Sequence, residues 1–460
     1  MYNSALCIRQ PLMPAPAQQR IDTVISARYL IPVVPEDTVL ENHSVALCGQ
    51  QIVEIFPTAE LPQRNCNGHN YSNARHYQLD QHILIPGLIN CHGHAAMSLL
   101  RGYADDLALM DWLQNHIWPA EGKWVGEQFV FDGTLLACAE MIRSGTTTFS
   151  DMYFFPDQAA RAALQAGLRA QLTFPIFEFP SNWGSNAQDY LHKGLAVRDT
   201  YKGHEMIQVV FGPHAPYTVA NATFERVATL AAETDSAIQV HLHETAFEVE
   251  SSLKEHGLRP IERLQQLGIL TPRTQCVHMT ALNGADIETI RRNGSHVIHC
   301  PESNLKLASG FCPVDKLMKA GINVALGTDS AASNDDLDIL GELKSAAQLG
   351  KAVAGDPTAL GGHSALRMAT LNGAKALGLE DRIGSIEVGK CADLCAVSIA
   401  ELEARPLYSP VSSLIYTNSG ARVKYVWVNG RCLLENGQLA TLHATELLAK
   451  ATEWEQKIKA

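Results

Sequence analysis

Positively charged residues are scarce for a chain of this length. The 460 residues include 36 lysines and arginines against 48 aspartates and glutamates, which gives a formal net charge of -12. Because nucleic acids and anionic membranes bind basic surfaces, this balance argues against both as partners. A small neutral or cationic substrate fits the charge better.

Two other patterns are missing. The 11 cysteines are an odd, scattered set without a Cys-x-x-Cys pair, so we expect neither a disulfide framework nor a structural zinc knuckle. No apolar run approaches the length of a membrane span, and Met1–Arg20 lacks the basic start and apolar core of a secretion signal. The sequence therefore predicts a soluble, cytoplasmic protein.

Short alternating apolar segments occur at both ends of the chain. They are Asp22–Ser26, Ser44–Cys48, Gln51–Ile55, Ile383–Lys390, Ala392–Val397 and Val423–Gly430. Such segments, bounded by turn residues, are typical of strands, and we expect the two flanks to close on each other as a small β-sandwich. Asn429-Gly430 predicts a tight turn, residues 445–459 predict an amphipathic helix, and residues 64–77 predict a loop.

The middle of the chain alternates apolar strand candidates with long helical segments. Eight strands are predicted, at His82–Asn90, Thr146–Met152, Arg169–Ile176, Ile207–Phe211, Ala237–Leu242, Gln275–His278, His296–His299 and Asn323–Gly327. This pattern predicts an α/β fold with a (β/α)₈ barrel. We expect residues 1–84 and 381–460 to build the β-sandwich, with a terminal helix, and residues 85–380 to build the barrel.

Potential metal ligands follow several of these strands. In a barrel the chemistry lies at the carboxyl ends of the strands, where this chain has His92, His94, His241 and Asp329. A catalytic zinc needs three or four nitrogen or oxygen ligands and one open position. Each residue alone could instead be a core histidine or, for Asp329, a helix cap. Together they predict one metal site, provided that the strand assignment holds.

Two further residues are suited to proton transfer. Glu244 lies three residues beyond His241 and could reach the substrate rather than the metal. His278, at the end of the sixth strand, could donate a hydrogen bond to an oxygen as negative charge develops on it. His243 would face away from His241 on a continuous strand, so we expect a structural role for it.

Six segments resemble one known family. They are Pro86 to His94, Trp118 to Glu121, Gly212 to His214, His241 to Glu244, Ser303 to Leu307 and Gly327 to Asn334. These segments are similar to the amidohydrolase superfamily and, within it, to the 5-methylthioadenosine/S-adenosylhomocysteine deaminases. The resemblance covers nearly the whole chain.

The resemblance implies a metal-dependent hydrolytic deaminase. One divalent ion per subunit, usually zinc, with Fe²⁺ or another ion possible, would be held by His92, His94, His241 and Asp329. Glu244 would protonate N1 of the purine while hydroxide attacks C6. Asp329 would take the proton of the attacking water and help deliver it to ammonia, and His278 would orient the oxygen.

The resemblance also implies contacts to a purine nucleoside. Glu121 would hold the ribose hydroxyls, His214 would contact the nucleoside, and Trp112 would form an apolar wall, although plain helix packing explains Trp112 equally well. A homodimer is expected from the family alone.

One departure bears on the substrate. Relatives that accept a homocysteine tail present arginines after the third strand, whereas this chain has the aromatic segment Phe174–Pro180 without a positive charge. A carboxylate would find no partner there, so we expect 5'-methylthioadenosine to be preferred over S-adenosylhomocysteine. Adenosine is a further possible substrate.

Alternative functions exist on the same fold. Deaminases of guanine, pterin or cytosine and triazine hydrolases share the barrel and the metal set, but Glu121 favours a nucleoside over a free base. A non-catalytic barrel serving as a scaffold is disfavoured because the full set of ligand and acid residues is present.

Overall fold

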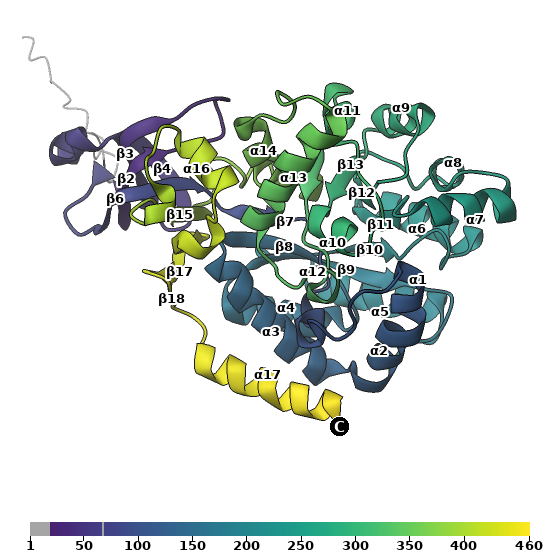
Figure 1. Ribbon diagram of the computed structural model, residues 1–460. Coiled ribbons are helices and arrows are strands. Elements are labelled where there is room, and N and C mark those ends of the chain that lie inside the picture. Colours follow the sequence, from purple (N-terminus) through teal and green to yellow (C-terminus); the bar gives the residue numbers. More distant parts are fainter. Residues whose placement is uncertain (1–18, 67–68) are drawn as a thin grey trace, which may run out of the picture.

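The structure, a computed structural model, describes residues 19–66 and 69–460 and contains two eight-stranded sheets (Figure 1). One sheet is parallel and forms a barrel, and the other is mixed and combines strands from both ends of the chain. The mixed sheet lies at the left of Figure 1 and the barrel at the right. The predicted fold class is confirmed.

The barrel strands follow one another around the sheet in chain order. They are β7 (Leu88–Asn90), β8 (Thr146–Met152), β9 (Arg169–Ile176), β10 (Ile207–Pro213), β11 (Ile238–Leu242), β12 (Thr274–His278), β13 (His296–His299) and β14 (Val324–Leu326). The first and last strands close the barrel: Cys91 N donates to Leu326 O at 2.8 Å, and Asp329 N donates to His92 O at 3.0 Å. This closure brings residues that follow β7 and β14 together at the carboxyl end of the barrel.

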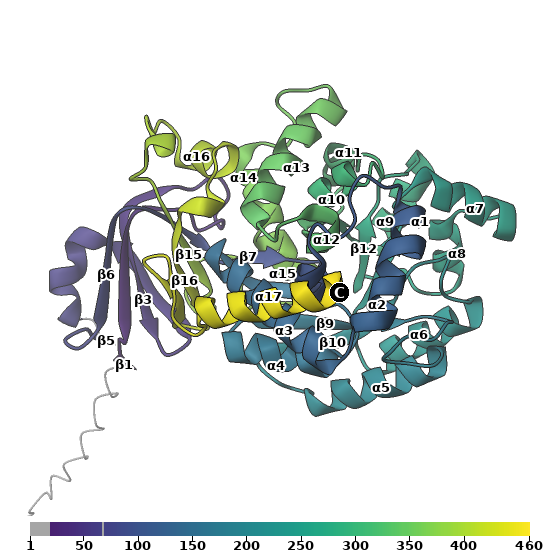
Figure 2. The ribbon, with the colours of Figure 1, turned by 60° about the horizontal axis from the view of Figure 1, so that its bottom comes forward.

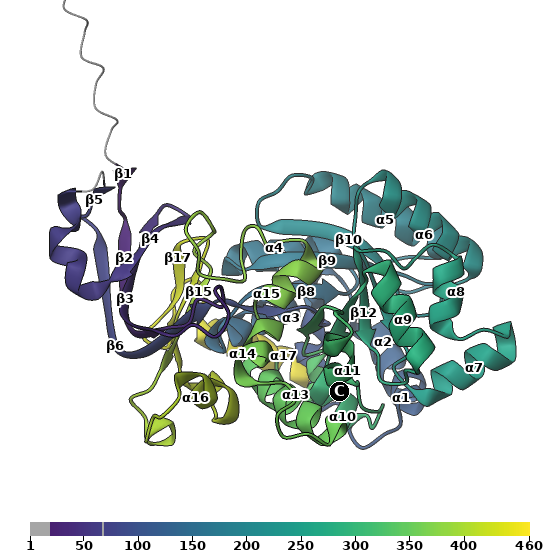
Figure 3. The same cartoon turned by 90° about the horizontal axis from the view of Figure 1, so that it is seen from above.

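Helices surround the barrel, as Figure 3 shows from above. They are α3 (Glu127–Arg143), α4 (Pro156–Ala166), α5 (Ala187–Thr200), α6 (Asn221–Glu233), α7 (Ala246–His256), α8 (Pro260–Gln266), α9 (Gly284–Asn293), α10 (Pro301–Lys306), α11 (Val314–Lys319), α12 (Ala331–Asn334), α13 (Ile339–Ala354), α14 (Gly362–Met368) and α15 (Leu371–Leu377). Helix α4 illustrates how the sequence defines them. Proline starts it, Gly167 in the left-handed region ends it, and a row of buried alanines packs it closely.

The predicted strand His82–Asn90 is wrong as a single element. The structure divides it into β6 (Arg75–Pro86), which belongs to the mixed sheet, and β7 in the barrel. The chain changes sheets at Gly87, where an added Cβ would lie 2.2 Å from the Thr147 side chain. The apolar pattern continues through this point because both strands are buried, and glycine permits the close approach.

The mixed sheet joins both flanks of the chain. Its order is β18 (Gln438–Leu439), β17 (Arg431–Glu435), β16 (Val423–Val428), β15 (Leu394–Ser398), β6, β2 (Thr23–Leu30), β3 (Leu40–Cys48) and β4 (Gln51–Pro57). A bridge from Gln51 to Cys391 brings the edge strand β4 back to the segment before β15, so the sheet curls around its own apolar core. Strands β1 (Gln19–Arg20) and β5 (His69–Asn70) form a separate short pair.

Two predictions for the flanks need correction. Ile383–Lys390 is not a strand, because Gly384 and Gly389 both adopt positive φ angles and turn the chain. The predicted loop at residues 64–77 includes the start of β6 and the end of a helical segment, η1 (Thr58–Cys66). The Asn429-Gly430 turn is confirmed: both residues have positive φ angles, and they connect β16 to β17.

The predicted terminal helix is confirmed as α17 (Ala444–Lys459), which lies along α3 in Figure 2. Its Trp454 packs edge-on against Phe129 and donates a hydrogen bond of 3.0 Å to Asp132 Oδ2. Within residues 19–66 and 69–460, no helix is both long and apolar enough to cross a membrane. Most of Met1–Arg20 lies outside the described residues, and the division of the chain at residues 84 and 380 stays a prediction.

A buried ion pair connects the barrel to the mixed sheet. Arg169, the first residue of β9, contacts Asp393 at 3.3 Å, and both side chains are at most 2% exposed. Removing the carboxylate would leave the guanidinium buried and unpaired, so we expect Asp393→Ala to lower the free energy of unfolding by about 3–5 kcal/mol. Denaturation in guanidinium chloride, followed by circular dichroism, measures this loss. Glu288→Gln, which removes an exposed ion pair, is the control and should leave the transition unchanged; equal effects of the two variants would contradict the prediction.

Candidate metal centre and active site

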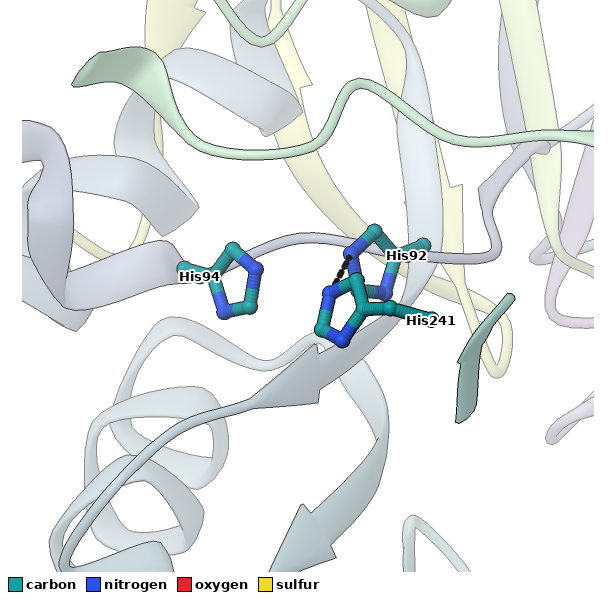
Figure 4. Close-up of side chains that lie close together, drawn as sticks. All are labelled: His92, His94 and His241. Atoms are coloured by element: carbon teal, nitrogen blue, oxygen red, sulfur yellow. Dashed lines mark hydrogen bonds between the residues drawn. The ribbon is translucent and has the colours of Figure 1, made fainter. Parts of the chain in front are cut away.

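Three histidines meet at the carboxyl end of the barrel. His92 and His94 follow β7, and His241 lies in β11 (Figure 4). Their ring nitrogens lie within 4.8 Å of one another, and Nε2 of His92 is 3.2 Å from Nε2 of His241. The alternation of side chains along an extended chain explains why both histidines of the His-Gly-His segment reach the same point.

Asp329 completes this group from the far end of the barrel sequence. Its Oδ1 lies 3.2 Å from Nε2 of His94 and 3.5 Å from Nε2 of His92, while its Oδ2 accepts a hydrogen bond of 2.7 Å from Ser303 Oγ. The alternative interpretation of Asp329 as a helix N-cap is wrong, because Ser330 is the N-cap of α12. The structure thus brings together all four predicted ligand residues.

The orientation of the rings indicates what the group can bind. Nδ1 of His94 lies 2.6 Å from Met152 O, and Nδ1 of His241 lies 2.8 Å from His214 O. Since a carbonyl oxygen only accepts, both Nδ1 atoms carry a proton, so each ring presents a lone pair at Nε2 when it is neutral. Burial lowers the pKa of His94, but the Asp329 carboxylate outweighs this effect and raises it to about 9, so a metal ion at His94 would displace the proton on Nε2. The ligand atoms of the three histidines lie within 4.8 Å of one another, and Asp329 Oδ1 lies near Nε2 of His92 and of His94. Three nitrogens and one carboxylate oxygen so arranged fit a divalent metal ion.

Glu244 and His278 lie beside this group. Nε2 of His278 is 3.6 Å from Glu244 Oε2, and Nδ1 of His278 is 2.9 Å from Asn304 Oδ1. Burial, helped by the negative charge of Asp329, raises the pKa of Glu244 to about 8. Glu244 therefore holds a proton at neutral pH and can donate it. His278 is also close enough to His92 and Asp329 to count as a potential ligand.

A pocket with about 680 Å³ of space not filled by atoms, part of it open to solvent, lies against these residues. Glu121, in α2 (Trp118–Trp124), lines it and accepts a hydrogen bond of 2.7 Å from Tyr153. Burial raises the pKa of Glu121 to about 7. His214 also lines the pocket, and burial lowers its pKa to about 3, so its ring is neutral.

Trp112 lines the pocket and begins a π-helical segment, η3 (Trp112–Ile117). The preceding segments are η2 (Ala95–Leu100) and α1 (Leu109–Asp111). The indole ring of Trp112 is buried, and within the described residues the Nε1 atom of Trp112 has no hydrogen-bond partner.

His243 lies outside the group, as expected. Its ring is held by Ala281 O at 3.0 Å and by the backbone nitrogen of Ile261 at 3.2 Å. The arrangement is structural, because both ring nitrogens already have backbone partners.

The sequence did not reveal the residues that hold the site residues in place. Gln239 contacts His92, Ser303 contacts Asp329, and Tyr153 contacts Glu121. A signal existed for Gln239, which lies two positions before His241 and so on the same side of the strand, and for Ser303, which begins one of the segments that resemble the family. Ser303 lies in α10 and Tyr153 directly follows β8, and only the fold brings them to this site.

The fold and this site define an amidohydrolase. The chain belongs to the amidohydrolase family, which it matches over residues 83–433. It is 51% identical to a 5-methylthioadenosine/S-adenosylhomocysteine deaminase of Teredinibacter turnerae, over 96% of this chain and 98% of the relative. A relative of the same name from Saccharophagus degradans is 49% identical, over 95% and 97% of the two chains.

A solved structure is also similar to this chain. An adenosine deaminase from Xanthomonas campestris with bound zinc superposes with a TM-score of 0.93 at 45% identity, over 96% of this chain and 99% of that one. The predicted family and the predicted enzyme class, a hydrolase of C–N bonds in cyclic amidines, are confirmed.

Proposed function

We propose that this chain is a zinc-dependent deaminase that converts 5'-methylthioadenosine and water to the inosine analogue and ammonia. The observation that carries the proposal is the meeting of three imidazoles, the Asp329 carboxylate and the buried carboxyl group of Glu244 at a single pocket. One zinc ion per subunit is held by His92, His94, His241 and Asp329. The names of the relatives and the zinc in the Xanthomonas campestris enzyme support both the reaction and the metal.

Bound zinc supplies a Lewis acid that lowers the pKa of water. The residues around it move the protons. Asp329, held by Ser303, takes a proton from the attacking water and passes it to the leaving amino group. Glu244 donates its proton to N1 of the purine, which makes C6 more electrophilic. His278 orients the oxygen that adds to C6: Nδ1 donates to Asn304 Oδ1, and burial lowers the pKa of the ring, so the neutral imidazole accepts at Nε2 from the O–H of the attacking water.

The pocket walls favour a nucleoside with an apolar 5' group. Glu121 is placed to accept hydrogen bonds from the ribose hydroxyls. A second, smaller hollow shares Trp118, Glu121, Phe154 and Phe177 with the pocket, and Phe179 and Pro180 extend it. In the described part of the chain, neither hollow is lined by lysine or arginine. The carboxylate of S-adenosylhomocysteine would find no cationic partner there. A cytoplasmic homodimer without a nucleic-acid partner stays a prediction.

The test is ammonia release by the purified, zinc-loaded protein from methylthioadenosine, S-adenosylhomocysteine, adenosine, guanine and cytosine. We expect methylthioadenosine to have the highest kcat/KM, at least about tenfold above S-adenosylhomocysteine, since a charge-assisted contact contributes roughly 1.5–3 kcal/mol. A free base with the highest kcat/KM would contradict a nucleoside site. A higher value for S-adenosylhomocysteine would contradict the apolar 5' site alone.

A further inference from the structure

A row of buried glutamines crosses the barrel interior beneath the candidate metal centre. Gln171, Gln208, Gln239 and Gln275 lie near the amino ends of β9, β10, β11 and β12, and their amides are hydrogen-bonded to one another. Gln239 reaches the centre, where its Oε1 lies 2.8 Å from Nδ1 of His92. Three of these side chains are almost completely buried. Four polar side chains in a barrel core are costly unless every one of them has partners.

We infer that this glutamine row is a positioning device that holds His92 in the tautomer that binds metal. The inference rests on the proposed metal site. A histidine ring can carry its proton on either nitrogen, and only a ring protonated at Nδ1 offers Nε2 to a metal ion. His92 differs from His94 and His241 here, because its Nδ1 meets a side-chain amide rather than a backbone carbonyl. An amide can rotate and present a donor instead, so its direction must be set by its other contacts.

Those contacts set the direction of the Gln239 amide. Its Nε2 lies 3.0 Å from Cys91 O and 2.7 Å from Gln275 Oε1, with Ser150 Oγ at 3.2 Å. Rotating the amide would place its oxygen against two acceptors and its nitrogen against the Nδ1–H of His92. The nitrogen of Gln239 therefore points into the row, and its oxygen accepts the proton of His92.

The amides of Gln275 and Gln171 are oriented in the same way, with the nitrogen of each pointing along the row. Gln275 Nε2 lies 2.8 Å from both Gln171 Oε1 and Ala376 O, and Gln171 Nε2 lies 3.1 Å from Gln208 Oε1 and 3.4 Å from Leu377 O. Ala376 and Leu377 end helix α15, and carbonyls at a helix end lack partners within the helix. A backbone carbonyl cannot exchange donor for acceptor, so the amides of Gln171, Gln239 and Gln275 are each held in one direction by an acceptor on the backbone.

The test measures zinc affinity, by competition with a chromophoric chelator, for variants at Gln239 and Gln275. Gln239→Met removes the acceptor for His92 and should weaken zinc binding on the order of tenfold, as loss of a ligand's outer partner does. Gln239→Glu keeps an acceptor for His92 and, when protonated, a donor toward Gln275 Oε1, so it should bind zinc more tightly than Gln239→Met. Gln275→Met, which frees one contact of the Gln239 amide, should weaken binding in the same direction by a smaller factor.

The ranking of the variants by zinc affinity distinguishes a role of the row in orienting His92 from a role in filling the core. If the row only fills the core, the charged variant Gln239→Glu will bind zinc more weakly than Gln239→Met, and that order overturns the inference. Thr173→Val is the matched control, since Thr173 Oγ1 is buried in the same barrel and has no hydrogen-bond partner among the described residues, and its zinc affinity should equal that of the wild type. Should neither Gln239 variant fold, equal zinc affinity of Gln275→Met and wild type overturns the inference. A wild-type protein that binds no zinc would overturn the proposed function itself.

Discussion

Replacing Glu244 by glutamine should leave the metal in place and lower kcat by about 10²–10⁴-fold, the usual contribution of a general acid or base. The amide keeps the size of the side chain and its contact with Ser309, but it cannot give a proton to the purine. Zinc content, measured by atomic absorption, should equal that of the wild type, because Glu244 is not among the proposed ligands. The rate of ammonia release then isolates the loss of proton transfer.

The pH dependence of the wild type gives an independent check. Since the protonated form of Glu244 is the active one, kcat/KM should fall as pH rises through its pKa. Burial sets that pKa at about 8, and a nearby cation, which favours the ionised carboxylate, lowers it.

The control for Glu244→Gln is Glu250→Gln, the same change at an exposed position of α7, which should behave as the wild type. Full activity in Glu244→Gln would remove Glu244 from the mechanism.

Removing the metal should abolish turnover. We expect a strong chelator to reduce ammonia release to the background and added zinc to restore it, because the attacking water would lose its Lewis acid. The same treatment should lower thermal stability. A ligand that binds only the folded state stabilises it by about 4 kcal/mol when its free concentration is about a thousand times its Kd.

Single variants test whether the metal that supports turnover binds at the proposed centre. His241→Ala should bind zinc weakly and be inactive even with zinc added, since one of four ligands is gone. His76→Ala, at an exposed histidine of β6 in the mixed sheet, should bind zinc and turn over substrate like the wild type. Activity that survives complete removal of metal would contradict the mechanism.

The candidate site was predictable because its residues follow apolar strands. His92, His94 and His241 belong to segments whose strand character is plain, and the barrel rule assigns the residues at such strand ends to one mouth. The strand prediction failed where the chain leaves one sheet for another. His82–Asn90 is apolar throughout most of its length, yet its two halves pair with β15 and β8, and periodicity carries no information about the partner strand.

The amino-acid sequence by itself determined the elements, the buried faces and the chemical types of the site residues, because these follow from local periodicity and from which side chains can bind metal or protons. The tertiary structure alone decided how closely those residues meet and which neighbours hold them. Gln239, Ser303 and Tyr153 act through contacts with residues distant in the chain. The proton position on His92 and the raised pKa of Glu244 arise from such contacts and from burial, since hydrogen-bond direction and desolvation depend on neighbours in space rather than in sequence.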